Sequence, residues 1–151
     1  MALADRQLGP YRAVVGTGVG EDDAGEGSHG AAHEDVVDLT VEDRPISVCG
    51  VHMSHLLYGS PRNFAELRHR LRTEARPDAA VAGDMNSWGP LVRLFMRGWK
   101  RAVIGRSWPA WRPHSQIDHI LVRGALRPHA GAVLPDAGSD HRPIRAELEV
   151  R

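Results

Sequence analysis

An acid and an amide two positions apart, Asp84 and Asn86, follow a run of small and apolar residues, Val81-Ala82-Gly83. In an extended backbone, residues i and i+2 project to the same side, so both side chains are expected at the end of one buried strand. A carboxylate and an amide on one edge can polarise a water, hold a hard cation or bind a phosphate oxygen. The same pattern is also common in turns, where both side chains cap their own backbone. The pattern alone therefore leaves a site and a simple turn open.

Three other strand ends carry similar side chains. His52 lies at the end of one expected strand, Asp118 near the start of another, and Asp140 and His141 in the loop before the last. Metal-assisted phosphate hydrolysis uses these groups: one carboxylate holds Mg²⁺ and a second orients and deprotonates a water. An imidazole hydrogen-bonds a phosphoryl oxygen or protonates the leaving group. The order of these residues along the chain therefore favours a phosphoesterase site.

The elements that must position these residues alternate between strands and helices. We expect strands at 11–15, 35–41, 46–53, 79–82, 116–122 and 144–150. Helices are expected to start at Ser60-Pro61 and at Trp88-Gly89-Pro90, because proline is favoured in a first helical turn. The turn sequence at 42–45 predicts an antiparallel hairpin, and the helix before strand 79–82 predicts a parallel crossover. The fold class is α/β, of the α+β type with a mixed sheet.

The spacing of apolar residues also predicts which faces are buried. The first helix is expected to bury Phe64, Leu67 and Leu71, and the second Leu91, Leu94 and Phe95. In strand 116–122, His119 lies on the opposite face from Asp118, so we expect His119 to be structural. The last strand alternates apolar with charged residues and is expected to have one solvated face.

Composition limits the broad class of the protein. The chain has 151 residues, of which 42% are hydrophobic and 25% charged, as in one ordinary soluble domain. Its 19 basic and 19 acidic residues cancel, which disfavours a non-specific nuclease. Cys49 is the only cysteine, so no disulfide can form within the chain. The sequence shows no leader and no apolar run of membrane-spanning length, so we expect a cytoplasmic protein.

Two loops and a group of histidines allow alternatives. Residues 16–34 are rich in glycine and acids and are expected to form a flexible loop. The tryptophan and proline loop at 107–113 could stack on a base or sugar, although packing over a sheet edge is favoured. A zinc site is a further hypothesis, with the ligands His29, His33, His52 and His55. It is disfavoured because these ligands span a flexible loop and include no thiolate.

The motifs together resemble one known family. They are Val51-His52, Gly83-Asp84-Met85-Asn86, Ile117-Asp118-His119 and Ser139-Asp140-His141-Arg142-Pro143-Ile144. Over roughly residues 45–150 the chain looks like the C-terminal part of the endonuclease/exonuclease/phosphatase superfamily, and its stretch 107–120 is similar to that of a bacterial subgroup. The resemblance implies a single domain over residues 1–151. It also implies a layered α/β/β/α sandwich with two mixed sheets, here without its first strands.

The resemblance also implies how a metal and a water would be held. Asp84 would orient and activate the attacking water. Asn86 would bind the phosphate or a metal-bound water. Asp140 would bind the divalent metal, Mg²⁺ or Mn²⁺, with Asp84 and Asn86 contributing to the metal site.

Three further residues would act on the phosphate group. The resemblance implies that His141 contacts the scissile phosphate and that Asp118 hydrogen-bonds and orients His141. His52 would donate to a phosphate oxygen. The substrate class is a phosphate ester, and a nucleic acid, a nucleotide and a phospholipid head group all remain open, as diester or monoester.

The sequence also departs from the family pattern. Family members begin with a strand that carries an asparagine and then a glutamate that binds metal, and neither motif is visible here. Glu21, Glu26 and Glu34 lie in or beside the glycine-rich loop and are poor substitutes. We therefore expect weak metal binding, low activity, and association of copies through an uncovered sheet edge. The alternative is a catalytically inactive relative that acts as a binding module.

Overall fold

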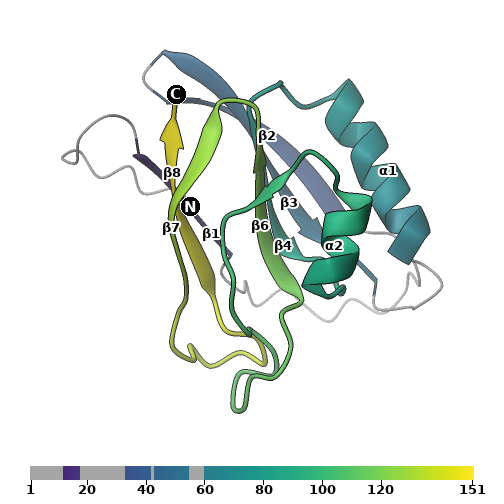
Figure 1. Cartoon of the computed structure of the whole chain (residues 1–151), viewed down its shortest axis with the longest axis vertical. Coiled ribbons are helices and arrows are strands. Elements are labelled where there is room, and N and C mark those ends of the chain that lie inside the picture. The colour runs from purple at the N-terminus through teal and green to yellow at the C-terminus, as the bar shows by residue number, and fades with distance from the viewer. Residues whose placement is uncertain (1–11, 18–32, 42, 55–59) are drawn as a thin grey trace.

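Two β-sheets pack face to face and form the centre of the molecule. The computed structural model describes residues 12–17, 33–41, 43–54 and 60–151 (Figure 1). The larger sheet has the strand order β2 (His33–Val41), β3 (Arg44–His52), β4 (Ala79–Asp84), β6 (Asp118–Arg123) and β5 (Lys100–Arg101). The smaller sheet has the order β1 (Arg12–Thr17), β8 (Ile144–Val150) and β7 (Leu126–Val133). The helices are α1 (Ser60–Thr73) and α2 (Gly89–Phe95).

The chain path through the larger sheet confirms the predicted hairpin and crossover. Strands β2 and β3 pair antiparallel around the turn that joins Val41 to Arg44. Helix α1 then carries the chain back, and β4 pairs parallel with β3. Strand β6 pairs antiparallel with β4 on its other side, so the five-stranded sheet is mixed. In the smaller sheet, by contrast, the three described strands are all antiparallel.

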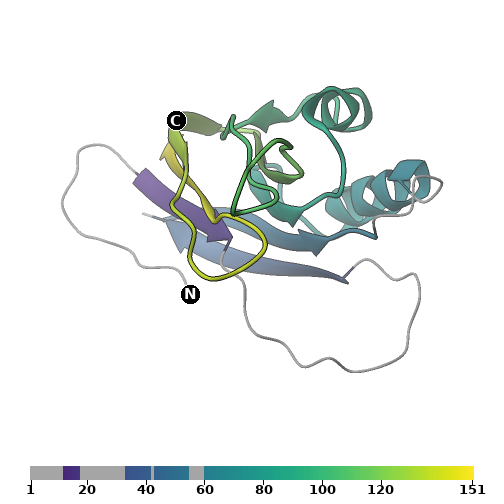
Figure 2. The same cartoon turned by 90° about the horizontal axis from the view of Figure 1, so that it is seen from below.

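Each face of the larger sheet packs against a different layer. Figures 1 and 2 show α1 and α2 together on one side of it, and the smaller sheet on the other. The helix side includes Phe64, Leu67 and Leu71, which are fully buried as predicted. The side between the sheets includes Ile120, Ile144 and Leu148. The two-sheet sandwich is therefore confirmed, although in the described residues both helices lie on one outer face. Neither helix of this part of the chain is long and apolar enough to cross a membrane.

The buried face of α2 differs from the prediction. Val92 and Met96 are buried, and the ring of Phe95 stacks on Phe64 with 5.0 Å between centroids. Leu91 and Leu94 were expected to point inward but are 43% and 51% exposed. Arg93 is the only charged residue of this seven-residue helix, so hydrophobic spacing cannot distinguish its two sides.

Strand β7 was not predicted, because its sequence lacks a strand pattern. It contains Pro128, and its pairing with β8 shifts register between Pro128 and Ala130. Most of its side chains are at least partly exposed, so no row of apolar residues marks it. Gly131 is required by close packing, because a Cβ there would lie 2.1 Å from the carbonyl oxygen of Ala102.

Candidate active site

Three neighbouring strands bring predicted site residues to one edge of the larger sheet. In the strand register, His52 of β3 is opposite Asp84 of β4, and Asp84 is opposite Asp118 of β6. Gly83 allows this close approach, because its φ is 146° and a Cβ would lie 1.9 Å from the carbonyl oxygen of Val51. Residues far apart in sequence therefore form one row.

Asp84 is held by a tight turn that also fixes Asn86. The backbone N–H of Asn86 donates to Asp84 Oδ1 at 2.7 Å, and Asn86 adopts a φ of 44°. The Asn86 amide nitrogen donates to the carbonyl of Met53 at 2.6 Å and to Asp84 Oδ2 at 3.1 Å. The turn interpretation of this motif is therefore correct, and the same turn orients a carboxylate at the sheet edge.

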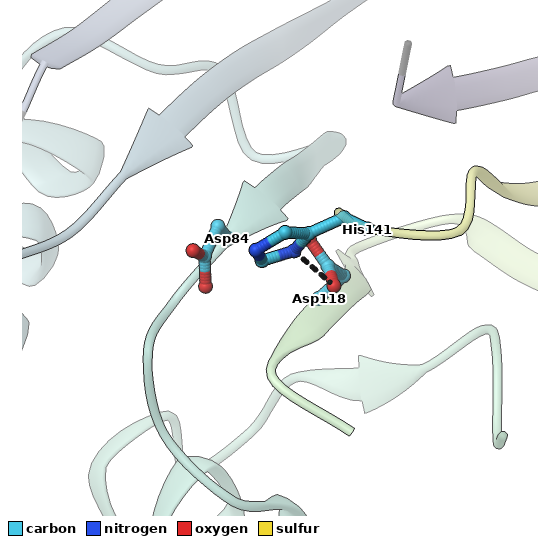
Figure 3. A group of neighbouring side chains, drawn as sticks. All are labelled: Asp84, Asp118 and His141. Carbon is cyan, nitrogen blue, oxygen red and sulfur yellow. Dashed lines mark hydrogen bonds and ion pairs between the residues drawn. The ribbon is translucent and has the colours of Figure 1, made fainter. Parts of the chain in front are cut away.

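His141 reaches this carboxylate row from the other sheet. It lies just before β8, and its Nδ1 is 3.0 Å from Asp118 Oδ2 and 3.2 Å from Asp118 Oδ1. Because a carboxylate accepts this hydrogen bond, Nδ1 carries the proton in this pair. Figure 3 shows the imidazole between two carboxyl groups, with its other nitrogen towards Asp84. The predicted pairing of Asp118 with His141 is thus present.

Ser107 is a contact that the sequence did not indicate. Its side chain is fully buried, and its hydroxyl donates to Asp118 Oδ2 at 2.5 Å. The same oxygen of Asp118 faces His141, so the carboxylate is held between a hydroxyl and an imidazole. No spacing rule links a serine to an acid eleven positions later, so only the tertiary structure could reveal this contact.

The tryptophan and proline loop at 107–113 supports the loop that carries Asp140 and His141. The N–H of Ala110 donates to the carbonyl of Asp140 at 2.7 Å. The N–H of Arg142 donates to the carbonyl of Ser107, and its guanidinium Nε to that of Ala110, both at 2.8 Å. Trp111 takes no part in this packing and is 76% exposed. The loop therefore contributes chiefly through its backbone.

Two predicted residues lie at the rim of this cluster. The Asp140 side chain is 80% exposed, and its Oδ2 is 3.8 Å from His141 Nε2. The His52 side chain is 73% exposed, and its Nε2 is 3.9 Å from Asp84 Oδ2. Both are within reach of a ligand bound at the cluster, but neither is held in place by a short hydrogen bond.

His119 occupies the helix side of β6, as predicted. Its side chain is fully buried, and Nε2 lies 2.9 Å from the carbonyl oxygen of Ser87. Burial lowers the pKa of His119 from 6.5 to about 4, so the ring is neutral at physiological pH. An uncharged imidazole on the far side of the sheet fits a structural role.

The electrostatics of the cluster favour a cation beside Asp84. Burial raises the pKa of Asp84, and the charge of Asp118 raises it further, while Asn86, His141 and His52 act in the opposite direction. One ligand atom each from Asp84, Asp118 and His141 lie within 4.8 Å of one another. The two carboxylates make this edge suited to a divalent cation beside Asp84, which would offset the penalty on that residue. Two of the four ligands in the zinc hypothesis, His29 and His55, lie outside the described residues.

Comparison with known proteins agrees with this fold. The model of the Endonuclease/Exonuclease/phosphatase family matches residues 10–141, and the chain belongs to this family. Members of this family are nucleases and phosphatases, so the family supports hydrolysis of phosphate esters. No curated protein sequence matches the chain significantly.

Solved structures share the fold at low sequence identity. One is a family member from Bacteroides thetaiotaomicron, with a TM-score of 0.66, 16% identity, and coverage of 91% of this chain and 64% of that chain. A mannosyl-6-phosphatase from the same species has a TM-score of 0.61 and 17% identity, and the match covers 71% of this chain and 52% of that chain. TDP2 of D. rerio, in complex with a single-strand DNA product, has a TM-score of 0.59 and 19% identity, and the match covers 79% of this chain and 62% of that chain. The chain thus spans at most about two thirds of the length of these structures.

Proposed function

We propose that the protein is a divalent-metal-dependent phosphoesterase that hydrolyses its substrate with an activated water. The observation that carries the proposal is the convergence of Asp84, Asp118 and His141, whose ligand atoms lie within 4.8 Å of one another. Because His141 comes from the segment before β8 and both acids from the other sheet, the site needs both sheets. This supports a single domain over residues 1–151.

Each residue of the cluster has a role in this reaction. Asp84, whose pKa is raised by burial, is suited to accept a proton from the attacking water. Asp118 fixes the tautomer of His141, so that His141 Nε2 can contact a phosphoryl oxygen or the leaving group. Asn86 Oδ1 and the rim residue His52 can bind the phosphate or its water. When bound, Mg²⁺ or Mn²⁺ would neutralise phosphate charge, held by Asp84, Asn86 and Asp140.

The substrate class is proposed only as a phosphate ester. The similar structures include a protein named as a mannosyl-6-phosphatase and one in complex with a single-strand DNA product, so the shared fold does not select between phosphomonoesters and phosphodiesters. A nucleic acid, a nucleotide and a phospholipid head group are all compatible with the cluster.

A metal-dependent activity screen tests the proposal. The protein is assayed against phosphomonoesters and phosphodiesters, including bis-p-nitrophenyl phosphate, with Mg²⁺, with Mn²⁺ and with a chelator. We expect turnover that requires the metal and is abolished in Asp84→Ala and in His141→Ala. If no substrate is turned over while the chain still folds, the protein is a binding module of this fold.

Metal affinity provides a second test. The family glutamate that binds metal has no visible counterpart in this sequence, and Mg²⁺ relies on few protein ligands in fixed geometry. We therefore expect titration calorimetry with Mg²⁺ or Mn²⁺ to give an affinity weaker than micromolar. A micromolar or tighter value would show that the described carboxylates suffice.

A further inference from the structure

The segment Met85–Ile117, which we call the basic segment, has a charge that differs from the rest of the chain. It contains six basic residues and no acidic one, although the whole chain has 19 of each. The rest of the chain is therefore left with 13 basic and 19 acidic residues. Arg93, Arg97, Lys100, Arg106 and Arg112 are exposed, and none pairs with a carboxylate of the described residues. A neutral protein thus presents one strongly cationic region.

The basic segment also carries most of the exposed apolar surface of the described residues. The described residues include six exposed large hydrophobic side chains, and five of these six belong to the basic segment. They are Trp88 (65%), Leu91 (43%), Leu94 (51%), Ile104 (80%) and Trp111 (76%). Single exposed apolar residues are ordinary, but Leu91 and Leu94 share the exposed side of α2, which makes this helix the candidate centre of an interaction surface.

In helix α2, the exposed apolar residues are additional to those that pack against the core. Its inner side is complete, because Val92 and Met96 are buried and Phe95 stacks on Phe64. Its outer side nevertheless carries Leu91 and Leu94. A surface helix normally places polar residues opposite its buried stripe, so a helix that is apolar on both sides is suited to a second contact.

The basic segment borders the catalytic cluster at both ends. It begins directly after Asp84, in the turn that fixes Asn86. Its last part contains Ser107, which binds Asp118, and Ala110, which binds the backbone of Asp140. Figure 1 shows α2 beside the larger sheet on its helix side, and the loop between β5 and β6 beyond the lower strand ends. A partner that binds this segment would therefore lie beside the site.

We propose that the basic segment is a docking surface for an anionic lipid bilayer. Tryptophan, leucine and isoleucine side chains enter the headgroup and acyl boundary, while arginine and lysine contact anionic headgroups. A single-stranded nucleic acid would also contact the cations and stack on Trp88 and Trp111. A nucleic acid would not stack on the exposed aliphatic side chains of Leu91, Leu94 and Ile104, because base stacking requires an aromatic ring. The aliphatic residues therefore favour the bilayer.

Co-sedimentation of the whole chain with vesicles tests this surface without relying on catalysis. Vesicles of phosphatidylcholine alone are compared with vesicles that also contain phosphatidylglycerol. We expect binding to the anionic vesicles to be at least about tenfold stronger, and to weaken as salt screens the headgroup charge. Equal binding to both vesicles, or no binding to either, overturns the proposal.

Paired variants separate the apolar from the electrostatic contribution. Leu91→Gln with Leu94→Gln, and separately Arg93→Gln with Arg97→Gln, should each reduce anionic-vesicle binding by about tenfold or more. The matched controls are Val37→Gln, which changes an exposed apolar residue of β2, and Arg68→Gln with Arg72→Gln on exposed positions of α1. The controls should bind as the parent does. If the controls lose binding equally, the effect is general and the assignment to this segment is wrong.

Two further outcomes would assign the surface to another partner. If single-stranded DNA binds more tightly than anionic vesicles and displaces them, the surface serves nucleic acid. If light scattering shows a dimer that Leu91→Gln with Leu94→Gln converts to a monomer, the outer side of α2 is a contact between copies of this chain. Either result overturns the bilayer proposal, whatever the activity screen shows.

Discussion

The two sides of β6 place neighbouring ionisable side chains in opposite situations. Asp118 and His119 are both buried, at 5% and 0% exposed. Asp118 faces the space between the sheets, where Ser107 and His141 both hydrogen-bond to its carboxylate. His119 faces the helices, where Nε2 contacts the carbonyl of Ser87 and Nδ1 has no partner among the described residues. Burial alone therefore does not distinguish a residue proposed to act in the reaction from a structural one.

The partners of each residue make the distinction. Asp118 is connected to an imidazole that reaches towards a second carboxylate, so its charge can influence a reaction. The imidazole of His119 hydrogen-bonds to the backbone carbonyl of Ser87, and burial lowers its pKa to about 4, so the ring stays uncharged near neutral pH. We expect changes at Asp118 to affect the rate, and changes at His119 to affect stability.

The largest expected effect comes from breaking the pair between Asp118 and His141. In Asp118→Asn the amide no longer fixes the Nδ1–H tautomer of His141, and kcat should fall by roughly 10²–10⁴-fold. The double variant with His141→Ala should be little worse than either single variant, because the two residues act as one unit. Steady-state kinetics on metal-loaded protein, with circular dichroism as the folding control, measure this. Additive losses would mean that the two residues act separately.

On the opposite side of β6, His119 should make stability depend on pH. The folded state keeps this ring neutral down to about pH 4, whereas the unfolded chain protonates near 6.5, so the unfolded state binds more protons between these values. The free energy of unfolding should therefore be highest above pH 6.5 and lose roughly 3 kcal/mol as the pH falls to about 4.

Denaturant unfolding of the parent and of His119→Phe at several pH values checks this expectation. The variant should lose this part of the pH dependence, although it also loses the hydrogen bond to Ser87. His69→Gln on α1 is the matched control, because His69 is exposed. A variant with the same acid sensitivity as the parent would place the titrating group elsewhere.

Ser107 should have a smaller effect on the Asp118 side. Ser107→Ala removes the hydroxyl that orients Asp118 Oδ2, and we expect kcat to fall about tenfold, in line with one hydrogen bond to a charged group. Ser107→Thr keeps the hydroxyl and should recover most of the rate. An equal loss in both variants would indicate a packing defect, and thermal unfolding of each variant tests for one.

The titration of Asp84 in the parent should show the smallest effect. Burial raises the pKa of Asp84 above the ordinary 3.8, and a bound cation would offset this penalty. In metal-free protein the Asp84 carboxyl should therefore protonate above pH 3.8, and added Mg²⁺ should shift its protonation to lower pH. NMR titration of the carboxyl carbon, with Asp84→Asn to assign the signal, measures both. Protonation at or below 3.8 without metal would remove the reason for proposing Asp84 as the base.

Much of the site could be predicted because it depends on local rules. Alternation along an extended backbone placed Asp84 and Asn86 at the end of a buried strand, and the crossover rule predicted a parallel pairing, which β4 makes with β3. The antiparallel pairing of β4 with β6, which brings Asp118 beside Asp84, followed from no sequence rule. The Asx turn at Asp84 also follows from residue type. The pairing of Asp118 with His141 came from the family resemblance, and the structure contains it.

The features that could not be predicted depend on long-range packing. Ser107 contacts Asp118 only because the tryptophan and proline loop folds back over the β8 entry loop. The outward side of α2 could not be identified because both of its sides are apolar. Strand β7 has no row of apolar residues that would mark it in the sequence, and it is held in the sheet by its pairing with β8.

The origin of the aspartate and the imidazole on separate sheets has a consequence for inactivation. Asp118 moves with the five-stranded sheet, whereas His141 is attached to the start of β8 in the other. A relative slide of the sheets by about an ångström would break the hydrogen bonds that tie the His141 loop to Ser107 and Ala110, and would separate His141 from Asp118, while every strand kept its own ladder. On warming, enzymatic failure should then precede any loss of far-ultraviolet ellipticity.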